Sequence, residues 1–137
     1  MRLLLVGSGG VGDAFARIAA RRDFFDGLVV ADYDLGRAER TVAAVRQRHP
    51  REMRFVAARI DASDASAVQT LAREHGVTHV MNAVDPRFVM PIFDGAFAAG
   101  ADYLDMAMSL SRPHPQAPHE QTGVKLGDEQ FAKATEW

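Results

Sequence analysis

A glycine-rich segment near the N-terminus has the spacing of a phosphate-binding turn. It follows the aliphatic run Leu3–Val6, opens a stretch with helical periodicity, and consists of Gly7, Ser8, Gly9, Gly10, Val11 and Gly12. In such a G-x-G-x-x-G turn the first glycine permits a tight bend, the second lets a pyrophosphate approach, and the third lets helix and strand pack closely. The free N–H groups at the helix start would hold the phosphates. The segment predicts a dinucleotide site; the alternative is a merely tight strand–helix turn.

An acidic residue, Asp32, ends the next aliphatic run, 20 residues after Gly12. A carboxylate at this place accepts hydrogen bonds from the adenosine ribose hydroxyls and repels a 2′-phosphate, so we expect NAD rather than NADP. Arg37 acts against this preference, because an arginine just past the strand could hold a 2′-phosphate. The alternative for Asp32 is a helix N-cap or a solvated loop acid, a role that Asp34 could share.

Asp61 and Ala62 follow the third aliphatic run, where a fold of this kind meets the adenine ring. Asp61 could accept a hydrogen bond from the adenine amino group. Equally, Asp61, Ser63 and Asp64 could only cap the next helix. We therefore count Asp61 and Ala62 among the candidate cofactor contacts and leave the capping role open.

Asn82 and Ala83 end the fourth run at the expected carboxyl edge of the sheet, where small residues let the cofactor come close. Asp105 ends the fifth run and is either catalytic or a hydrogen-bonding partner of the following loop. The Tyr and Lys that short-chain dehydrogenases carry four residues apart are absent, because Ala107 follows Tyr103 at that spacing and an arginine follows Tyr33. The catalytic residues thus stay unknown.

These residues need alternating strands and helices to position them. Continuous aliphatic or β-branched runs predict buried strands at Leu3–Val6, Leu28–Ala31, Arg54–Ala57, Thr78–Met81 and Tyr103–Asp105. Apolar residues at helical spacing fill the intervals between these runs. The alternation with short links predicts right-handed crossovers and an α/β fold, a Rossmann-like doubly wound parallel sheet of five or more strands.

The C-terminal part differs from the rest of the chain in its composition and spacing of apolar residues. Three prolines between 113 and 118 exclude a helix or a central strand there, whereas 128–137 has helical spacing with Phe131, Ala134 and Trp137 on one face. We expect a dinucleotide-binding domain at 1–108. We expect 109–137 to be a Pro-rich exit loop and the start of a helix that leads to a missing substrate domain. The aromatic face would then be covered by another copy or by further chain.

Composition narrows the functional classes. The 137 residues are 47% hydrophobic and 25% charged, as in a soluble single domain, and the net charge of −2 argues against nucleic-acid or anionic-membrane partners. Cysteine is absent, which excludes disulfides, thiolate metal sites and thiol catalysis. The five histidines show no metal-ligand spacing, and no run is long enough to span a bilayer. We expect a cytoplasmic protein without a metal.

The motifs also recur together in one family. The turn at 7–12, Asp32, and then Asp61–Asp64, His79–Ala83 and Gly100–Asp105 occur in this order over nearly the whole chain. As a set they resemble the N-terminal cofactor-binding domain of the saccharopine dehydrogenase (saccharopine reductase-like) family. The resemblance implies an NAD(P)-dependent oxidoreductase that transfers a hydride to or from a C–N bond of a small amino-acid or polyamine-like substrate. It also implies a second, substrate-holding domain and a homodimer in the full-length protein.

Two other functional classes stay open at this point. One is a nucleotide-sensing regulatory Rossmann module of the potassium-transport type, which shares the glycine turn and the acid of the second strand. The Pro-rich exit loop and the segment Asn82–Pro86 argue against it. The other is a pseudoenzyme or interaction fragment that keeps the fold without turnover. We further expect the chain as given to be catalytically silent, because residues 109–137 are too few to enclose a substrate.

Overall fold

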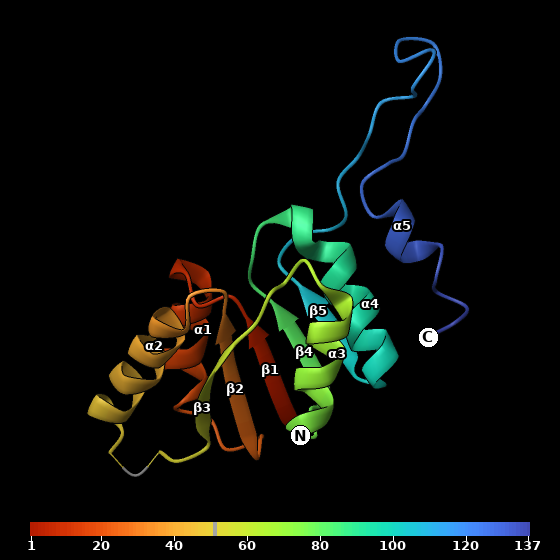
Figure 1. The fold of residues 1–137 in the computed structure, drawn as a ribbon. Coiled ribbons are helices and arrows are strands. Elements are labelled where there is room, and N and C mark those ends of the chain that lie inside the picture. Colours follow the sequence, from red (N-terminus) through yellow and green to blue (C-terminus); the bar gives the residue numbers. More distant parts are fainter. Residues whose placement is uncertain (51) are drawn as a thin grey trace.

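The computed structural model describes residues 1–50 and 52–137 and shows alternating strands and helices (Figure 1). The elements in chain order are β1 (Arg2–Val6), α1 (Gly10–Ala19), β2 (Gly27–Asp32), α2 (Leu35–Arg48), β3 (Phe55–Arg59), α3 (Ala65–Glu74), β4 (His79–Asn82), the 3₁₀ helix η1 (Pro86–Phe88), α4 (Val89–Ala99), β5 (Asp102–Asp105) and α5 (Asp128–Phe131). Among the described residues, no helix is both long and apolar enough to cross a membrane.

All five strands are parallel and form one sheet in the order β3-β2-β1-β4-β5. The order changes direction at β1, so the carboxyl ends of β1 and β4 border the crevice where open α/β sheets bind ligands. The Rossmann-like fold class predicted from the sequence is confirmed. The strand β3 extends two residues beyond the predicted end because Arg59 still pairs with Asp32 of β2.

Two hydrophobic layers hold the sheet between its helices. Alternate residues of β1 point to opposite faces: Leu3 and Leu5 pack with α1 and α2, whereas Leu4 and Val6 pack with α3 and α4. This explains the continuous aliphatic runs in the sequence, because both faces of the inner strands are covered. The arrangement brings the loops that follow β1, β2, β3 and β4 to one edge of the sheet (Figure 1).

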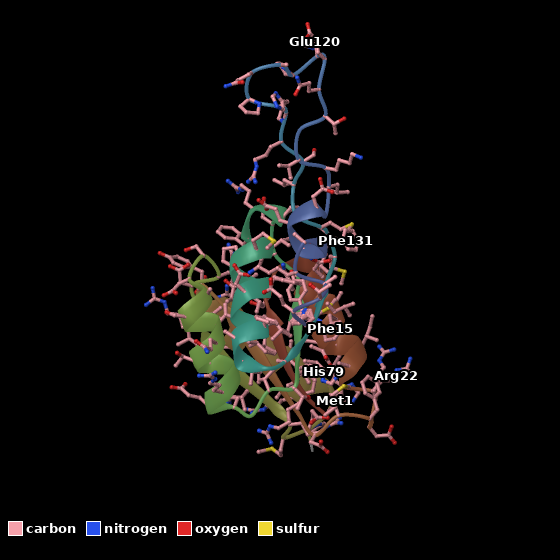
Figure 2. All side chains as sticks on the ribbon, turned by 90° about the vertical axis from the view of Figure 1, so that its right-hand side faces the viewer. Met1, Phe15, Arg22, His79, Glu120 and Phe131 are labelled. Carbon is pink, nitrogen blue, oxygen red and sulfur yellow. The ribbon has the colours of Figure 1, made fainter. Side chains whose placement is uncertain are left out.

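The C-terminal part forms an arm that projects from the domain and then returns. Arg112 and Val124 make an antiparallel bridge at its base, and Figure 2 shows Glu120 at its far end and Phe131 back beside the domain. The predicted helix over 128–137 is wrong beyond Phe131, where the chain continues in turns.

Trp137 packs within its own chain, with its ring centroid 4.9 Å from that of Phe93 and 5.2 Å from that of Phe97. One continuous helix would have put Trp137 on the same face as Phe131, which is instead 65% exposed. The chain itself thus covers part of the Trp137 side chain, which stays 47% exposed, so cover by another copy or by further chain is not needed for that part. The aromatic contacts with α4 replace the helix that local periodicity predicted.

Candidate nucleotide-binding site

The turn between β1 and α1 requires glycine at two positions for packing reasons. Gly7 has φ +97°, and a Cβ atom there would lie 2.4 Å from Val84 Cγ1. A Cβ at Gly12 would lie 1.8 Å from the carbonyl oxygen of Gly7. Both distances are far shorter than any real contact of a Cβ atom, so the first and last glycines of the motif let the strand and helix meet.

The middle of the turn is open. A Cβ atom built on Gly9 or Gly10 meets no atom of the described residues within 4 Å. Gly9 is the N-cap of α1, and among the described residues no side chain caps this helix. The first N–H groups of α1 thus have no side-chain acceptor among the described residues, and such groups, together with the helix dipole, favour a bound anion.

Asp32 lies beside this turn with its carboxylate already oriented. It is 8% exposed; its Oδ2 accepts hydrogen bonds from Ser8 N at 2.8 Å and Ser8 Oγ at 3.0 Å, and its Oδ1 accepts one from Asp34 N at 3.0 Å. Burial of Asp32 opposes ionisation, but these hydrogen bonds and the charge of Arg37 hold its pKa below the ordinary value. The carboxylate is therefore a fixed negative charge at the end of β2.

The alternative role of Asp32 as a helix cap is excluded. The N-cap of α2 is Asp34, whose Oδ1 accepts a hydrogen bond from Gly36 N at 2.9 Å. In the same way Asp64 caps α3, accepting from Ser66 N at 2.8 Å. Asp61 does not cap that helix, because its Oδ1 accepts from Ser63 N at 2.9 Å and from Ser63 Oγ at 2.6 Å. These two bonds lower the pKa of Asp61.

A cavity of about 230 Å³ lies where β1, β2, β3 and β4 end. It is lined by Val6, Gly7, Asp32, Tyr33, Arg37, Ile60, Asp61, Ala62, Val84 and Phe88. Its volume lies below the roughly 300–1,000 Å³ of typical ligand pockets, so it suits one part of a dinucleotide. The structure thus brings four sequence-predicted residues together here: Gly7, Asp32, Asp61 and Ala62.

Asn82 and Ala83 do not line this cavity. The Asn82 side chain is 1% exposed; its Nδ2 donates to Tyr103 Oη at 2.9 Å, and its Oδ1 accepts from Val84 N at 3.0 Å. Burial raises the pKa of the Tyr103 phenol, so Tyr103 stays neutral. Asn82 therefore shapes the turn after β4, and Ala83 N continues the sheet by donating to Val6 O at 2.8 Å.

The cavity also includes residues that the sequence analysis did not single out, notably Tyr33, Ile60 and Phe88. They are apolar or aromatic side chains next to strand ends, a pattern too common to identify a site. Asp105 makes a hydrogen bond to the C-terminal segment: its Oδ2 accepts from Gln130 Nε2 of α5 at 3.0 Å.

Comparison with known proteins identifies the family. A family model described as the saccharopine dehydrogenase NADP binding domain matches residues 3–137. The chain belongs to the saccharopine dehydrogenase family. A carboxyaminopropylagmatine dehydrogenase of Synechocystis sp. is 33% identical over 109 residues, which are 77% of this chain and 25% of that protein. The chain thus spans about a quarter of this relative, and it is an NAD(P)-binding domain of the oxidoreductase family.

Solved structures support the fold. Apo saccharopine dehydrogenase (L-Glu forming) from Saccharomyces cerevisiae has a TM-score of 0.59 and 20% identity, covering 83% of this chain and 22% of the yeast chain. Quinate dehydrogenase from Corynebacterium glutamicum in complex with NAD has a TM-score of 0.51 and 22% identity, covering 75% of this chain and 43% of its own. The family description names NADP and the second structure holds NAD, so a nicotinamide dinucleotide is supported without a choice between the two.

Proposed function

We propose that this domain binds NAD(H) for an oxidoreductase that transfers a hydride to or from a C–N bond of an amino-acid or polyamine-like substrate. The observation that supports this best is the Asp32 carboxylate, which Ser8 holds beside the open N-terminus of α1. The nicotinamide ring of the bound cofactor supplies or accepts the hydride. The domain itself has to bind and orient that cofactor.

The proposed contacts follow the geometry of the site. The N–H groups around Gly9, Gly10 and Val11 would hold the diphosphate, because no side chain of the described chain caps α1 and the space beside Gly9 and Gly10 is open. Asp32 would accept a hydrogen bond from a ribose hydroxyl. It takes three hydrogen bonds from the protein, and a carboxylate offers about four acceptor positions, so one position is free. Asp61 and Ala62 would border the adenine, and Ala83 the nicotinamide ribose.

We propose NAD as the preferred cofactor, on the basis of charge. An ionised Asp32 on the cavity wall repels a 2′-phosphate, which carries close to two negative charges. Arg37, also on that wall, is the opposing group; its Nε lies 3.8 Å from Asp34 Oδ2, and its side chain is mostly exposed. The Asp34 carboxylate already offsets part of the positive charge of Arg37, and this supports the preference for NAD.

Calorimetry with NADH and NADPH tests this proposal. Asp32→Ala should weaken NADH binding by about ten-fold or more and reduce the difference from NADPH, because a charge-assisted hydrogen bond is lost and a repulsion is relieved. Asp64→Ala is the matched control: it likewise removes an acid that caps a helix, α3, but Asp64 does not line the cavity. Tighter binding of NADPH than NADH by the unchanged protein would overturn the NAD preference.

Gly9→Val tests the phosphate site separately. A side chain there fits the free domain, because the space is open, but it would occupy the place of the diphosphate. We expect an unchanged melting temperature and a loss of NADH binding. Unchanged NADH affinity in this folded variant would refute the assignment of the turn.

The substrate proposal rests on the relatives. The similar carboxyaminopropylagmatine dehydrogenase supports an amino-acid or polyamine-like compound, and this chain spans 25% of that protein. We therefore propose that the 137 residues bind cofactor but do not turn over substrate alone. Steady NAD reduction by this chain with lysine, saccharopine or a carboxylated polyamine would contradict that proposal.

A further inference from the structure

The Asp32 carboxylate has little hydrogen-bonding capacity left for a ligand. Its Oδ2 already accepts from Ser8 N at 2.8 Å and from Ser8 Oγ at 3.0 Å, and its Oδ1 accepts from Asp34 N at 3.0 Å. A carboxylate oxygen offers about two acceptor positions, so Oδ2 is saturated and the one free position lies on Oδ1. A ribose with free 2′- and 3′-hydroxyls brings two donors to this place. One of these hydroxyls is therefore left without an acceptor on Asp32.

Ser8 supplies two of the three bonds to Asp32, and only one of them is needed to orient the carboxylate. The backbone N–H groups of Ser8 and Asp34 each hold one carboxylate oxygen, and they belong to the loops that follow β1 and β2. These two bonds fix the plane of the carboxylate without the Ser8 hydroxyl. The hydroxyl adds a second donor to Oδ2 and so takes a position that a ligand hydroxyl needs.

The Ser8 hydroxyl can act on a ligand only through Asp32. Ser8 is 7% exposed and is not among the residues that line the nucleotide cavity, whereas Asp32 is one of them. Among the described residues, Asp32 is the one hydrogen-bond partner of Ser8 Oγ. Turning the hydroxyl away would leave a buried polar group unpaired, which is unfavourable. The hydroxyl therefore stays on Asp32 when a ribose arrives.

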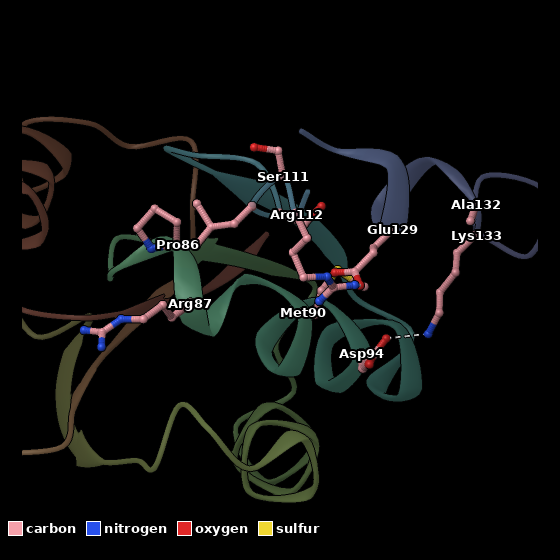
Figure 3. A pocket seen from close by; sticks show the side chains of 11 residues that line it. Pro86, Arg87, Met90, Asp94, Ser111, Arg112, Glu129, Ala132 and Lys133 are labelled. Carbon is pink, nitrogen blue, oxygen red and sulfur yellow. Dashed lines mark hydrogen bonds and ion pairs between the residues drawn. The ribbon is translucent and has the colours of Figure 1, made fainter. Parts of the chain in front are cut away.

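No other side chain in the described part of the chain donates a hydrogen bond to Asp32. The positive charge of Arg37 acts on it, but Arg37 Nε lies 3.8 Å from Asp34 Oδ2 and pairs there. Arg87, in the turn after β4, lines a second cavity of about 750 Å³ between α4 and the C-terminal segment. Figure 3 shows its side chain directed away from the other labelled residues. Ser8 is thus the side chain that competes with a ribose for Asp32.

We propose that the Ser8 hydroxyl limits the affinity of this domain for nucleotides with two free ribose hydroxyls, because it occupies the acceptor position on Asp32 that the second hydroxyl would use. This inference rests on the proposed function, since it requires a ribose at Asp32. It makes Ser8 a positioning residue that sets how strongly the domain distinguishes a ribose with two hydroxyls from a ribose with one. Removal of the Ser8 hydroxyl should strengthen binding, the opposite of the effect expected for Asp32→Ala.

The probes are ADP and 2′-deoxy-ADP, which differ by one ribose hydroxyl. Calorimetry with the unchanged chain should give affinities within about two-fold of each other, because either ligand can fill the single free position. Ser8→Ala should bind ADP about five-fold more tightly, the affinity equivalent of one net hydrogen bond, and should bind 2′-deoxy-ADP as before. The four affinities form a double-mutant cycle that measures the second acceptor position on Asp32.

Two serines with the same geometry provide matched controls. Ser63 N and Oγ both donate to Asp61 Oδ1 on the cavity wall. Ser66 N and Oγ both donate to Asp64 Oδ1 outside the cavity. Asp61 Oδ2 has no hydrogen-bond partner among the described residues, so Asp61 has free acceptor positions even with its serine in place. Ser63→Ala and Ser66→Ala should therefore each change the affinity for ADP by less than about two-fold.

Two further measurements separate the hydrogen bond of Ser8 from the volume of its side chain. Ser8→Cys has a side chain of similar size but a weak donor, so it should tighten ADP binding as Ser8→Ala does. Burial opposes ionisation of Asp32, and the hydrogen bonds from Ser8 are among the contacts that nevertheless lower its pKa. Carboxyl-carbon NMR of Ser8→Ala should therefore show a higher pKa for Asp32, a change that a packing role alone would not cause.

Three results would overturn the inference. They are unchanged or weaker binding of ADP by Ser8→Ala, an equal gain for ADP and 2′-deoxy-ADP, and an unaltered pKa of Asp32 in Ser8→Ala. The affinity of Asp32→Ala for ADP separates these failures from a failure of the proposed function. If Asp32→Ala weakens ADP binding, only the role of Ser8 is wrong. If Asp32→Ala binds ADP equally well, or the unchanged chain does not bind it, no ribose lies at Asp32 and both proposals fail.

Discussion

Gly10→Ala and Gly12→Ala, two substitutions in one turn, should have opposite effects on the stability of the domain. Both glycines lie in the first turn of α1, where alanine is the better helix former by up to about 1 kcal/mol. At Gly10 the new methyl group meets no described atom within 4 Å. Gly10→Ala should therefore be neutral or stabilise the fold by a few tenths of a kcal/mol to about 1 kcal/mol.

At Gly12 the same methyl group would lie 1.8 Å from Gly7 O and 2.8 Å from Gly7 C. These atoms belong to the backbone, so no side chain can rotate out of the way, and α1 has to move away from β1. Overpacking of this kind costs about 1–3 kcal/mol and occasionally more. Subtracting a helix-propensity gain of about 1 kcal/mol from the upper end leaves a net loss of about 2 kcal/mol.

Thermal and urea unfolding of the two variants beside the unchanged protein is the assay. For a chain of this size a loss of about 2 kcal/mol lowers the melting temperature by roughly 6–10 °C. NADH calorimetry on the same samples adds a second reading, because a methyl group at Gly10 intrudes on the proposed phosphate space while leaving the fold intact. Equal stabilities of the Gly10→Ala and Gly12→Ala proteins would refute the packing argument.

Other perturbations test the contacts that support the site. Tyr103→Phe removes the acceptor of the buried Asn82 amide and should cost about 1–3 kcal/mol in urea unfolding, whereas an unchanged midpoint would mean that Asn82 has another partner. Asp32 has a pKa lowered by the Ser8 and Asp34 hydrogen bonds, so its stabilising contribution is complete above the unfolded-state pKa and is lost as pH falls through the lower folded-state value. The stability curves of the unchanged protein and Asp32→Asn should accordingly converge in acid. Trp137, the single tryptophan, should show red-shifted emission in Phe93→Ala if its ring packs on α4.

The fold could be predicted because its signals are local. A strand covered on both faces needs an unbroken apolar run, and such runs mark β1 and β2, whereas the edge strands β3 and β5 keep partly exposed residues. The prediction of a helix over 128–137 was wrong for the opposite reason. The spacing of this segment is helical, but the contacts of Trp137 with Phe93 and Phe97 come from a distant part of the chain and outweigh it.

The cavity could be predicted only where chain direction determines side-chain position. Asp32 ends β2 and Asp61 follows the end of the adjacent parallel strand β3, so chain direction alone brings them to one edge of the sheet. Asn82 has the same kind of place at the end of β4, yet its amide faces inward. Its partner, Tyr103, lies 21 residues further along the chain, and no local pattern identifies that hydrogen bond.

The glycine at position 7 shows how the motif depends on residues outside it. The side chain that excludes a Cβ there is Val84, whose place is set by the Asn82 hydrogen bond to Val84 N and by the bond from Ala83 N to Val6 O. Loosening the turn after β4 would therefore remove the steric conflict but not the second constraint, the φ of +97°, which disfavours every L side chain. Because these two constraints are independent, compensating changes at Val84 cannot make another residue acceptable at Gly7. The first glycine of the turn is thus required by the fold itself, whereas the open position at Gly9 is left to the ligand.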